Sequence, residues 1–227
     1  MKKLFLVVLM LAGGSMAHAD PCAPGTLQDY IDLAPGGCAI GVVTFMNFES
    51  APGQNFATPI DPALVQVTPG GLPVLPRLTF TVNQSADAGE LFESFFRFNA
   101  LASILSGDSM LLGPASATED GVVIASQDIC PGGAFSGISP VGCPSIPSTL
   151  ITFAADFGSS NSETALFAPP TNFFDIFVDL TIDGGISGTA HLESATVQLN
   201  AVPEPATVLL VGTFLGGLAL RRLRQRS

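Results

Sequence analysis

Residues 172–183 read NFFDIFVDLTID, and apolar and polar side chains alternate along most of this stretch. Because successive side chains of a β-strand point to opposite faces, a period of two predicts a strand with one buried and one exposed face. The predicted buried face carries Phe174, Ile176, Val178, Leu180 and Ile182, and the predicted exposed face carries Asp175, Asp179, Thr181 and Asp183. The stretch therefore favours a β-sheet protein.

Six further runs are short and rich in valine, isoleucine, threonine and phenylalanine, which suit pleated, half-buried surfaces. They are residues 39–49, 78–83, 91–99, 122–126, 150–154 and 189–200. Turn residues separate them, at Ala51-Pro52-Gly53, Pro69-Gly70-Gly71, Asp120-Gly121, Pro131-Gly132-Gly133 and Asp183-Gly184-Gly185. Many short strands joined by such turns predict an all-β fold, an antiparallel β-sandwich, over residues 20–200.

Two regions leave alternatives open. Residues 98–112 (FNALASILSGDSMLL) fit either a short helix or two edge strands. Residues 132–148 are the richest in glycine, proline and serine, and they favour a long loop over a hinge between two domains. We therefore expect a single domain between the two terminal segments.

The N-terminal residues have the order of a secretory signal peptide. Met1-Lys2-Lys3 is basic, residues 4–12 are apolar, and Ala17-His18-Ala19 matches the small-residue cleavage pattern, with Ala17 and Ala19 at its small positions. The apolar run is too short for a permanent membrane span. We predict that residues 1–19 are removed and that the exported chain begins at Asp20.

Residues 202–227, VPEPATVLLVGTFLGGLALRRLRQRS, fall into three zones. Pro203 and Pro205 flank Glu204 and disfavour a helix there. Residues 206–220 carry no charge and, as a helix, would cover roughly 22 Å, which is short for a bilayer span. Four arginines follow, Arg221, Arg222, Arg224 and Arg226. Because arginine is costly inside a bilayer, we expect them to end a membrane helix on the cytoplasmic side.

This order of Pro-Glu-Pro, apolar helix and arginine cluster resembles the PEP-CTERM sorting signal of exported bacterial proteins. All three parts match, over about 25 of the 227 residues. The resemblance implies that an exosortase-type membrane enzyme recognises Pro203-Glu204-Pro205 and processes the chain. It also implies a link to exopolysaccharide and biofilm production. It implies nothing about the domain that precedes the signal. An ordinary C-terminal anchor is the alternative.

The exported part is strongly acidic and contains all four cysteines. Residues 20–202 hold eighteen acidic residues and two arginines, a net charge of −16, against −11 for the whole chain. This charge argues against nucleic-acid binding. An even number of cysteines in an oxidising compartment predicts disulfides. We favour Cys22 with Cys38 and Cys130 with Cys143, because each pair brackets a loop rich in proline and glycine. No C-x-x-C spacing supports a zinc site.

Catalytic signatures are missing from the sequence. His191 is the only histidine left after signal removal, no nucleophile motif accompanies it, and we expect it to face solvent. The chain has no tryptophan and a single tyrosine, Tyr30, which disfavours a sugar-stacking site. We expect its strand phenylalanines to lie in the core: Phe95, Phe96, Phe98, Phe173, Phe174 and Phe177.

Metal and cofactor signals are equally weak. Glu119-Asp120-Gly121 and the pair Asp179 and Asp183 are candidates for calcium, but neither follows a known calcium loop. We predict no metal, no cofactor and no catalytic residue. The favoured function is a non-enzymatic protein of the cell envelope or extracellular matrix, anchored in the inner membrane and then released to the surface. The alternatives are a glycan-binding adhesin and a hydrolase that uses paired carboxylates.

Overall fold

The computed structural model describes residues 19–51, 57–137 and 140–202. The predicted signal peptide up to residue 18, the Pro-Glu-Pro motif, the apolar run and the four arginines lie outside these residues. Within them, no helix has the length and apolar character needed to cross a bilayer.

Thirteen strands and one short helix follow one another along the described chain. Their bounds are β1 Gly25–Thr26, α1 Leu27–Asp32, β2 Cys38–Ile40, β3 Val43–Ala51, β4 Thr58–Pro59, β5 Gln66–Leu72, β6 Leu75–Ala86, β7 Leu91–Leu112, β8 Ala115–Thr118, β9 Val122–Pro131, β10 Ser148–Ala155, β11 Gly158–Ser160, β12 Ser162–Asp183 and β13 Thr189–Ala201.

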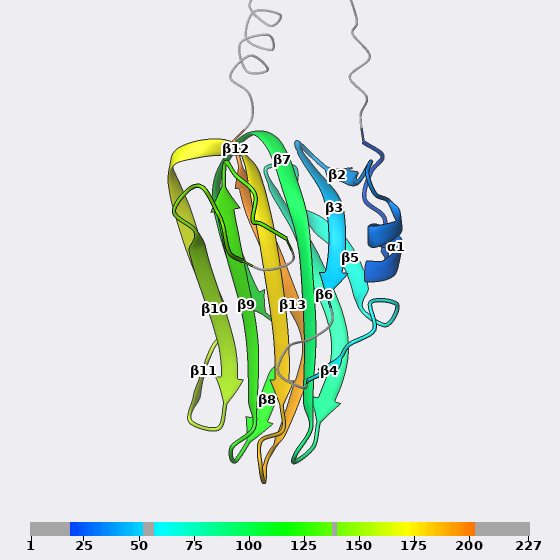
Figure 1. Ribbon diagram of the computed structural model, residues 1–227, viewed down its shortest axis with the longest axis vertical. Coiled ribbons are helices and arrows are strands. Elements are labelled where there is room, and N and C mark those ends of the chain that lie inside the picture. The colour runs from blue at the N-terminus through cyan, green and yellow to red at the C-terminus, as the bar shows by residue number, and fades with distance from the viewer. Residues whose placement is uncertain (1–18, 52–56, 138–139, 203–227) are drawn as a thin grey trace, which may run out of the picture.

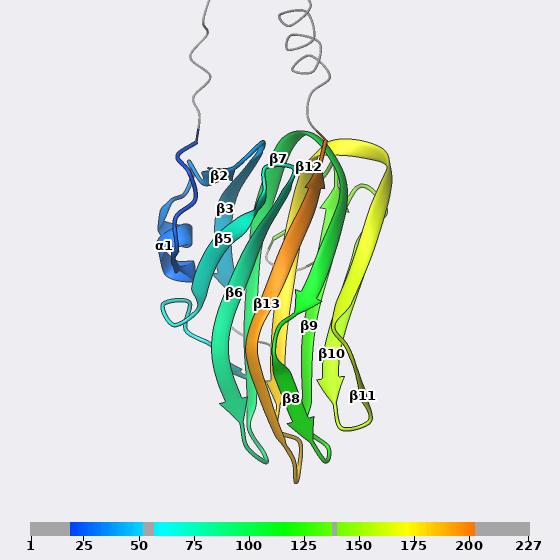
Figure 2. The same ribbon diagram turned by 180° about the vertical axis from the view of Figure 1, so that it is seen from behind.

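The strands form two packed layers, so the predicted all-β, mostly antiparallel sandwich is confirmed (Figures 1 and 2). The front layer contains β2, β3, the first half of β7, the second half of β12, β9, β10 and β11. The back layer contains β1, β5, β6, β13, β8, and the remaining halves of β7 and β12. The two 22-residue strands β7 and β12 each pass from one layer to the other over the same end: β7 runs up the front and down the back, whereas β12 runs up the back and down the front.

The expectation for residues 98–112 was wrong in both of its forms. They are neither a helix nor two edge strands but the continuation of β7, the long central strand. Between Leu105 and Leu166 the pairing with β12 is irregular, because four residues of β12 stand opposite Ser106 alone. Pro169 and Pro170 lie in this extra segment, and proline cannot donate to a ladder. The sequence around the bend therefore lacks a regular strand pattern, although the strand continues through it.

The stretch 172–183 lies in β12, and its inward face is as predicted. Phe174, Ile176, Val178, Leu180 and Ile182 are all fully buried. The outward face is less exposed than the alternation predicts, because Asp175 and Phe177 are buried as well. The loop after β9 covers this part of the sheet, which a pattern of period two cannot indicate.

Other element boundaries differ from the predicted ones. Pro69-Gly70-Gly71 is not a turn but lies inside β5, paired with residues 76–78 of β6. The chain reverses instead between Leu72 and Leu75. A turn at Gly41 divides the predicted run 39–49 into β2 and β3. The turns at Asp120-Gly121 and Asp183-Gly184-Gly185 lie where the sequence predicts them.

Aromatic rings fill the space between the layers. Phe80 of the back layer meets Phe96 of the front layer with ring centroids 4.4 Å apart, and Phe48 stacks on Phe98 at 5.1 Å. Of the six phenylalanines expected in the core, five are buried and Phe173 is half-buried. Helix α1 closes one side of the core through Tyr30, whose ring packs edge-on against Phe48.

Helix α1 was not predicted, although its start signal is readable. Thr26 and Asp29 form a capping box in which each side chain accepts a hydrogen bond from the other residue's backbone N–H. Only one turn and a half follows, too short for a helical period to stand out.

Both favoured cysteine pairs are disulfides. Cys22 bonds to Cys38 and Cys130 to Cys143, and their Cα atoms are 4.8 Å and 5.6 Å apart. The first disulfide holds the chain ahead of α1 against β2. The second closes the 132–148 loop where it leaves β9.

Candidate functional site

The outward face of the front layer, here called the front face, brings polar and aromatic side chains of five strands together. The strand register places these side chains in rows across β3, β7, β12, β9 and β10. From one end downward the rows are Met46, Asn99, Asp175 and Cys130; then Glu49, Arg97, Phe177, Asp128 and Thr149; then Ala51, Phe95, Asp179, Ser126 and Ile151; then Glu93, Thr181, Ile124 and Phe153.

Three carboxylates form a diagonal across these rows. Glu93 of β7, Asp179 of β12 and Asp128 of β9 lie on neighbouring strands, each offset by one row from the next. Diagonal neighbours in a sheet are roughly 7 to 8 Å apart. We call Glu93, Asp179 and Asp128 the acidic diagonal. The sequence pairs Asp179 instead with Asp183, which stands four residues away along the same strand.

The acidic diagonal changes the chemistry of its central member. Burial, and then the negative charge of Glu93, raise the pKa of Asp179 to about 7, against the lowering effect of a hydrogen bond from Thr181. Asp128 adds a smaller raising effect and accepts a hydrogen bond from the Thr149 hydroxyl. A carboxyl that holds its proton near neutral pH can donate a hydrogen bond while its neighbours accept them.

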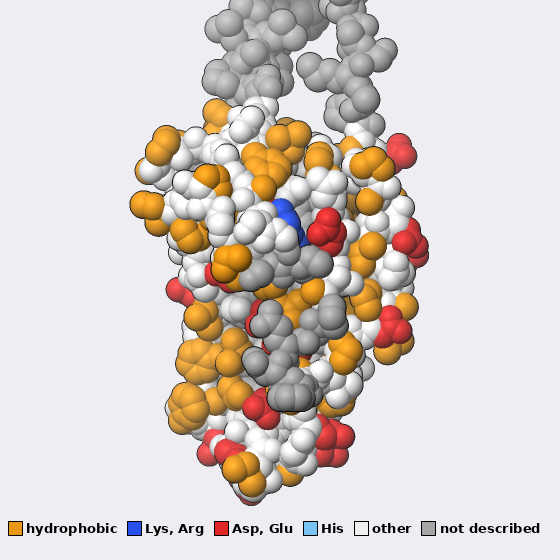
Figure 3. Space-filling view, viewed as in Figure 1, with side chains coloured by type: hydrophobic (Ala, Val, Ile, Leu, Met, Phe, Trp, Pro, Cys, Tyr) orange, Lys and Arg blue, Asp and Glu red, His pale blue; other side chains and the backbone are white. Residues whose placement is uncertain are grey.

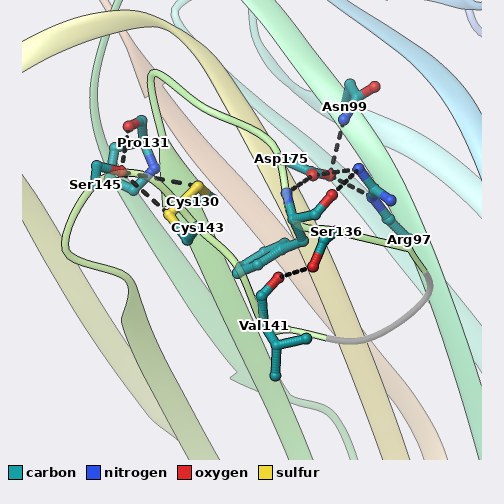
Figure 4. The surroundings of a disulfide bond; sticks show 10 residues. Arg97, Asn99, Cys130, Pro131, Ser136, Val141, Cys143, Ser145 and Asp175 are labelled. Atoms are coloured by element: carbon teal, nitrogen blue, oxygen red, sulfur yellow. Dashed lines mark hydrogen bonds and ion pairs between the residues drawn. A yellow bond between two sulfur atoms is a disulfide. The ribbon is translucent and has the colours of Figure 1, made fainter.

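A buried ion pair closes the other end of the front face (Figure 4). Asp175 is fully buried, and Arg97 binds it through two N–H groups, with Nε to Oδ1 at 2.7 Å. Asn99 Nδ2 and the backbone N–H of Phe135 donate to the same carboxylate at 2.8 Å and 2.7 Å.

Arg97 also holds the loop itself. Its guanidinium donates to the carbonyls of Gly137 and Phe135, which belong to the 132–148 loop. Phe135 of that loop packs against Phe95 and Phe177 of the sheet. The ion pair and the disulfide therefore fasten the loop to the sheet, as the sequence predicts for the disulfide alone.

An exposed and a half-buried aromatic ring pair at the edge of the front face. Phe157, in the turn between β10 and β11, is 86% exposed and pairs with Phe153 at a centroid distance of 6.1 Å. Ile151 of β10 is also exposed. Orange side chains gather over the lower part of β10 and β11 in Figure 3. Phe153 shares a row with Glu93 of the acidic diagonal, so rings and carboxylates occupy one surface.

The calcium candidate Asp120 has a structural role. Its two oxygens accept hydrogen bonds from the backbone N–H groups of Ile186, Ser187 and Gly188 and from the Ser187 hydroxyl. These bonds lower its pKa to about 2. They fix the β12–β13 turn, where Gly185 has a φ of +69° and a Cβ would lie 2.6 Å from Asp120. No cluster of three metal-ligating side chains occurs among the described residues.

Two further polar groups lie elsewhere. His191 is half-buried rather than fully solvent-facing, and its Nδ1 lies 2.9 Å from the Ser85 hydroxyl across the β6–β13 pair. Asp108 is fully buried between the layers, and Gln127 donates to it from β9. Burial raises the pKa of Asp108 well above the ordinary value. The sequence pattern does not indicate this pair, because Asp108 lies in residues 98–112, which fit more than one secondary structure.

Comparisons with known proteins do not place the chain in a family. No family model and no curated protein matches the sequence. Among solved structures, the chain is similar to TmCBM61 in complex with β-1,4-galactotriose, at a TM-score of 0.29 and 10% identity over 66% of this chain and 86% of the other.

Two other solved structures are similar at the same low level. One is endoglucanase 3 of Trichoderma harzianum, with a TM-score of 0.23 and 11% identity over 67% of this chain and 98% of the other. The second is the enzymatically active domain of tailspike protein 4 from bacteriophage CBA120, with a TM-score of 0.23 and 9% identity over 70% of this chain and 19% of the other. Such low scores carry no argument about fold or function.

Proposed function

We propose that the chain is an exported protein of the bacterial cell envelope, held at the membrane by residues 206–226. The observation that supports this best is the position of the two ends of the described chain. Both leave the sandwich at the same end, which we call the proximal pole (Figure 1). A sandwich tethered there would present its other end, the distal pole, to the surroundings.

The route of the last strand supports the same arrangement. The backbone N–H groups of Ala201 and Val202 donate to the carbonyls of Val74 and Ile104, at 2.9 Å and 3.0 Å. The chain is therefore held against the proximal pole up to the residue before Pro203. Two disulfides also suit export, because they persist in oxidising compartments.

In this proposal an exosortase-type enzyme is the partner. Glu204 provides the charge that the enzyme recognises, and the arginines hold residues 206–220 in the inner membrane until processing. The sandwich itself has a structural or surface role, and the chemistry belongs to the processing enzyme.

Replacing Glu204 with alanine is expected to block processing, because the substitution removes the only charge between Val202 and the arginines. In a host that carries exosortase, the variant should accumulate as a membrane-bound form that keeps its arginine tail, as immunoblots of membrane and medium fractions would measure. Glu193→Ala, a change at another acidic residue in β13, is the control. Normal release of the Glu204→Ala protein would contradict the sorting role.

A second candidate function is the binding of a neutral polysaccharide on the front face. The observation that favours it is the pair of the exposed Phe157 and the half-buried Phe153 on the same surface as the acidic diagonal. Aromatic rings offer flat apolar surfaces, and carboxylates accept hydrogen bonds from hydroxyl groups. A net charge of −16 would repel acidic polysaccharides, so the ligand would be uncharged.

Phe157→Ala is expected to weaken binding to such a polysaccharide by about 2- to 12-fold, since stacking on a ring contributes roughly 0.5 to 1.5 kcal/mol beyond area burial. Affinity electrophoresis against a panel of neutral and acidic polysaccharides would measure this. Ile186→Ala, which changes a 91% exposed side chain at the distal pole, is the matched control. The candidate fails if the unmodified protein binds none of the neutral polysaccharides.

A further inference from the structure

We propose that the proximal pole is itself a membrane-contacting surface, and that the sandwich stands on the lipid headgroups rather than swinging freely on its tether. This inference rests on the proposed anchoring by residues 206–226, and it adds an orientation and a contact surface. It commits to one occupant of the pole, the bilayer that holds the same chain.

The first observation is the charge of the loops at the two poles. At the proximal pole lie the β2–β3 turn, the β5–β6 turn, the loop from β9 to β10, and the bends of β7 and β12. None of these segments carries a charged residue in the sequence: residues 41–42, 73–74, 102–106, 132–147 and 167–172. Asp20 lies at the margin of this pole, beside the positive α-amino group that signal removal would create.

The distal pole has the opposite character. Its four connections join β6 to β7, β8 to β9, β10 to β11 and β12 to β13. They contain or adjoin six acidic residues and no basic one: Asp87, Glu90, Glu119, Asp120, Asp156 and Asp183. Figure 3 shows red side chains at this lower end, whereas orange ones gather at the upper end. Anionic headgroups therefore repel one pole and not the other.

Exposed apolar side chains are the second observation. Ile146 is 89% exposed and Leu166 77% exposed, and both line a groove of about 630 Å³ between the β9–β10 loop and the bend of β12. Phe167, Pro169 and Pro170 line the same groove. Leu72 and Val42 are exposed in the neighbouring turns, and Val202 is exposed where the described chain ends. Apolar side chains grouped in this way favour contact with an apolar or interfacial phase.

The tether length is the third observation. Four Cα-to-Cα steps separate Val202 from Ala206, the first residue of the apolar run. A fully extended chain spans about 14 Å over four residues. The headgroup region is only about 5 to 8 Å thick on each side of the bilayer. Because Val202 is hydrogen-bonded to the pole, even a fully extended tether would keep this point of the pole within about 6 to 9 Å of the headgroup surface.

Site-directed fluorescence on residues 20–227, reconstituted into vesicles of phosphatidylethanolamine and phosphatidylglycerol, tests the proposal. One fluorophore is attached at Leu166→Cys and, in a second protein, at Ile186→Cys after the native disulfides have formed. A quencher is carried on the lipid headgroups. We expect quenching at position 166 to exceed that at position 186 several-fold. Adding Ile146→Asp should reduce the quenching at position 166, and adding Glu193→Asp, a charge-conserving change in β13, should not.

The outcomes separate the contact from the anchor. Equal quenching at both positions in protein that floats with the vesicles would overturn the contact and leave the anchor intact. Protein that does not float with the vesicles would overturn both. Energy transfer between copies labelled at position 166 in detergent would show that a second copy covers the pole, which also overturns the proposal.

Discussion

Replacing Arg97 with methionine is expected to lower the free energy of unfolding by about 3 to 5 kcal/mol, the usual cost of breaking one side of a buried ion pair. Asp175 has no exposed surface, and the substitution removes two of its four hydrogen bonds. A charged carboxylate would then remain in the sheet without its cation. Chemical denaturation followed by circular dichroism measures the loss.

The same substitution should also release the loop that Arg97 holds. Arg97 donates to two carbonyls of the 132–148 loop, so the loop should become cleavable by a protease of broad specificity while the disulfide stays intact. Arg77→Met is the matched control, because Arg77 is exposed on β6. If the loop of the Arg97→Met protein is cleaved no faster than the loop of the Arg77→Met protein, the ion pair does not fasten the loop to the sheet.

Replacing Asp108 with asparagine is expected to make the protein more stable at alkaline pH and to remove part of the pH dependence of its stability. Burial raises the pKa of this carboxyl well above its ordinary value of 3.8. The folded protein therefore keeps a proton that the unfolded chain releases. The stabilisation is complete below about pH 4 and is lost as the pH rises, by about 1.4 kcal/mol per pH unit until the folded protein also loses the proton.

Asparagine retains the shape of the acid and cannot ionise. The asparagine amide oxygen can accept the hydrogen bond that Gln127 Nε2 donates to Asp108. The asparagine NH2 group can also donate a hydrogen bond, and Gln127 Oε1 is an acceptor without a donor among the described residues. Urea denaturation from pH 4 to pH 9 should show a shallower fall for Asp108→Asn than for the unmodified protein. Asp156→Asn, at an exposed acid in the β10–β11 turn, is the control. Parallel curves for the unmodified protein and Asp108→Asn would contradict the account.

Asp179 changes the pH dependence of the free energy of unfolding in the same direction as Asp108. Its pKa is raised to about 7, so it stabilises the protein below about pH 4 and loses this effect as the pH rises toward 7. The Asp108→Asn protein should therefore keep a slope in that range. The difference between the two proteins isolates Asp108.

The sequence indicates the fold better than it indicates the residues of the front face. Alternation in residues 172–183 identifies the inward side of β12, and the spacing of the cysteines identifies both disulfides. It does not show that β7 continues through residues 98–112, because the bend between the layers interrupts the period. Strands that change layers carry signals of two environments, and a local pattern cannot separate them.

The sequence does not predict the candidate site for a different reason. Glu93, Asp179 and Asp128 are far apart in the chain, and only the register of β7, β12 and β9 brings them onto one diagonal. The same is true of Arg97 and Asp175, which are 78 residues apart. The available signals for a buried pair were Arg97, a lone arginine in the predicted strand 91–99, and the aspartates of the predicted strand 172–183. Phe157 was readable as exposed, because it follows Asp156 and precedes Gly158 in a turn.

The most direct test of the whole account is intact-mass spectrometry of the native protein recovered from the envelope and from the medium of the same culture. We predict an N-terminus at Asp20, four oxidised cysteines in both fractions, and loss of the arginine tail in the released form. Recovery of the chain from the cytosol with Met1 present, its thiols reduced and residues 203–227 intact would contradict the account.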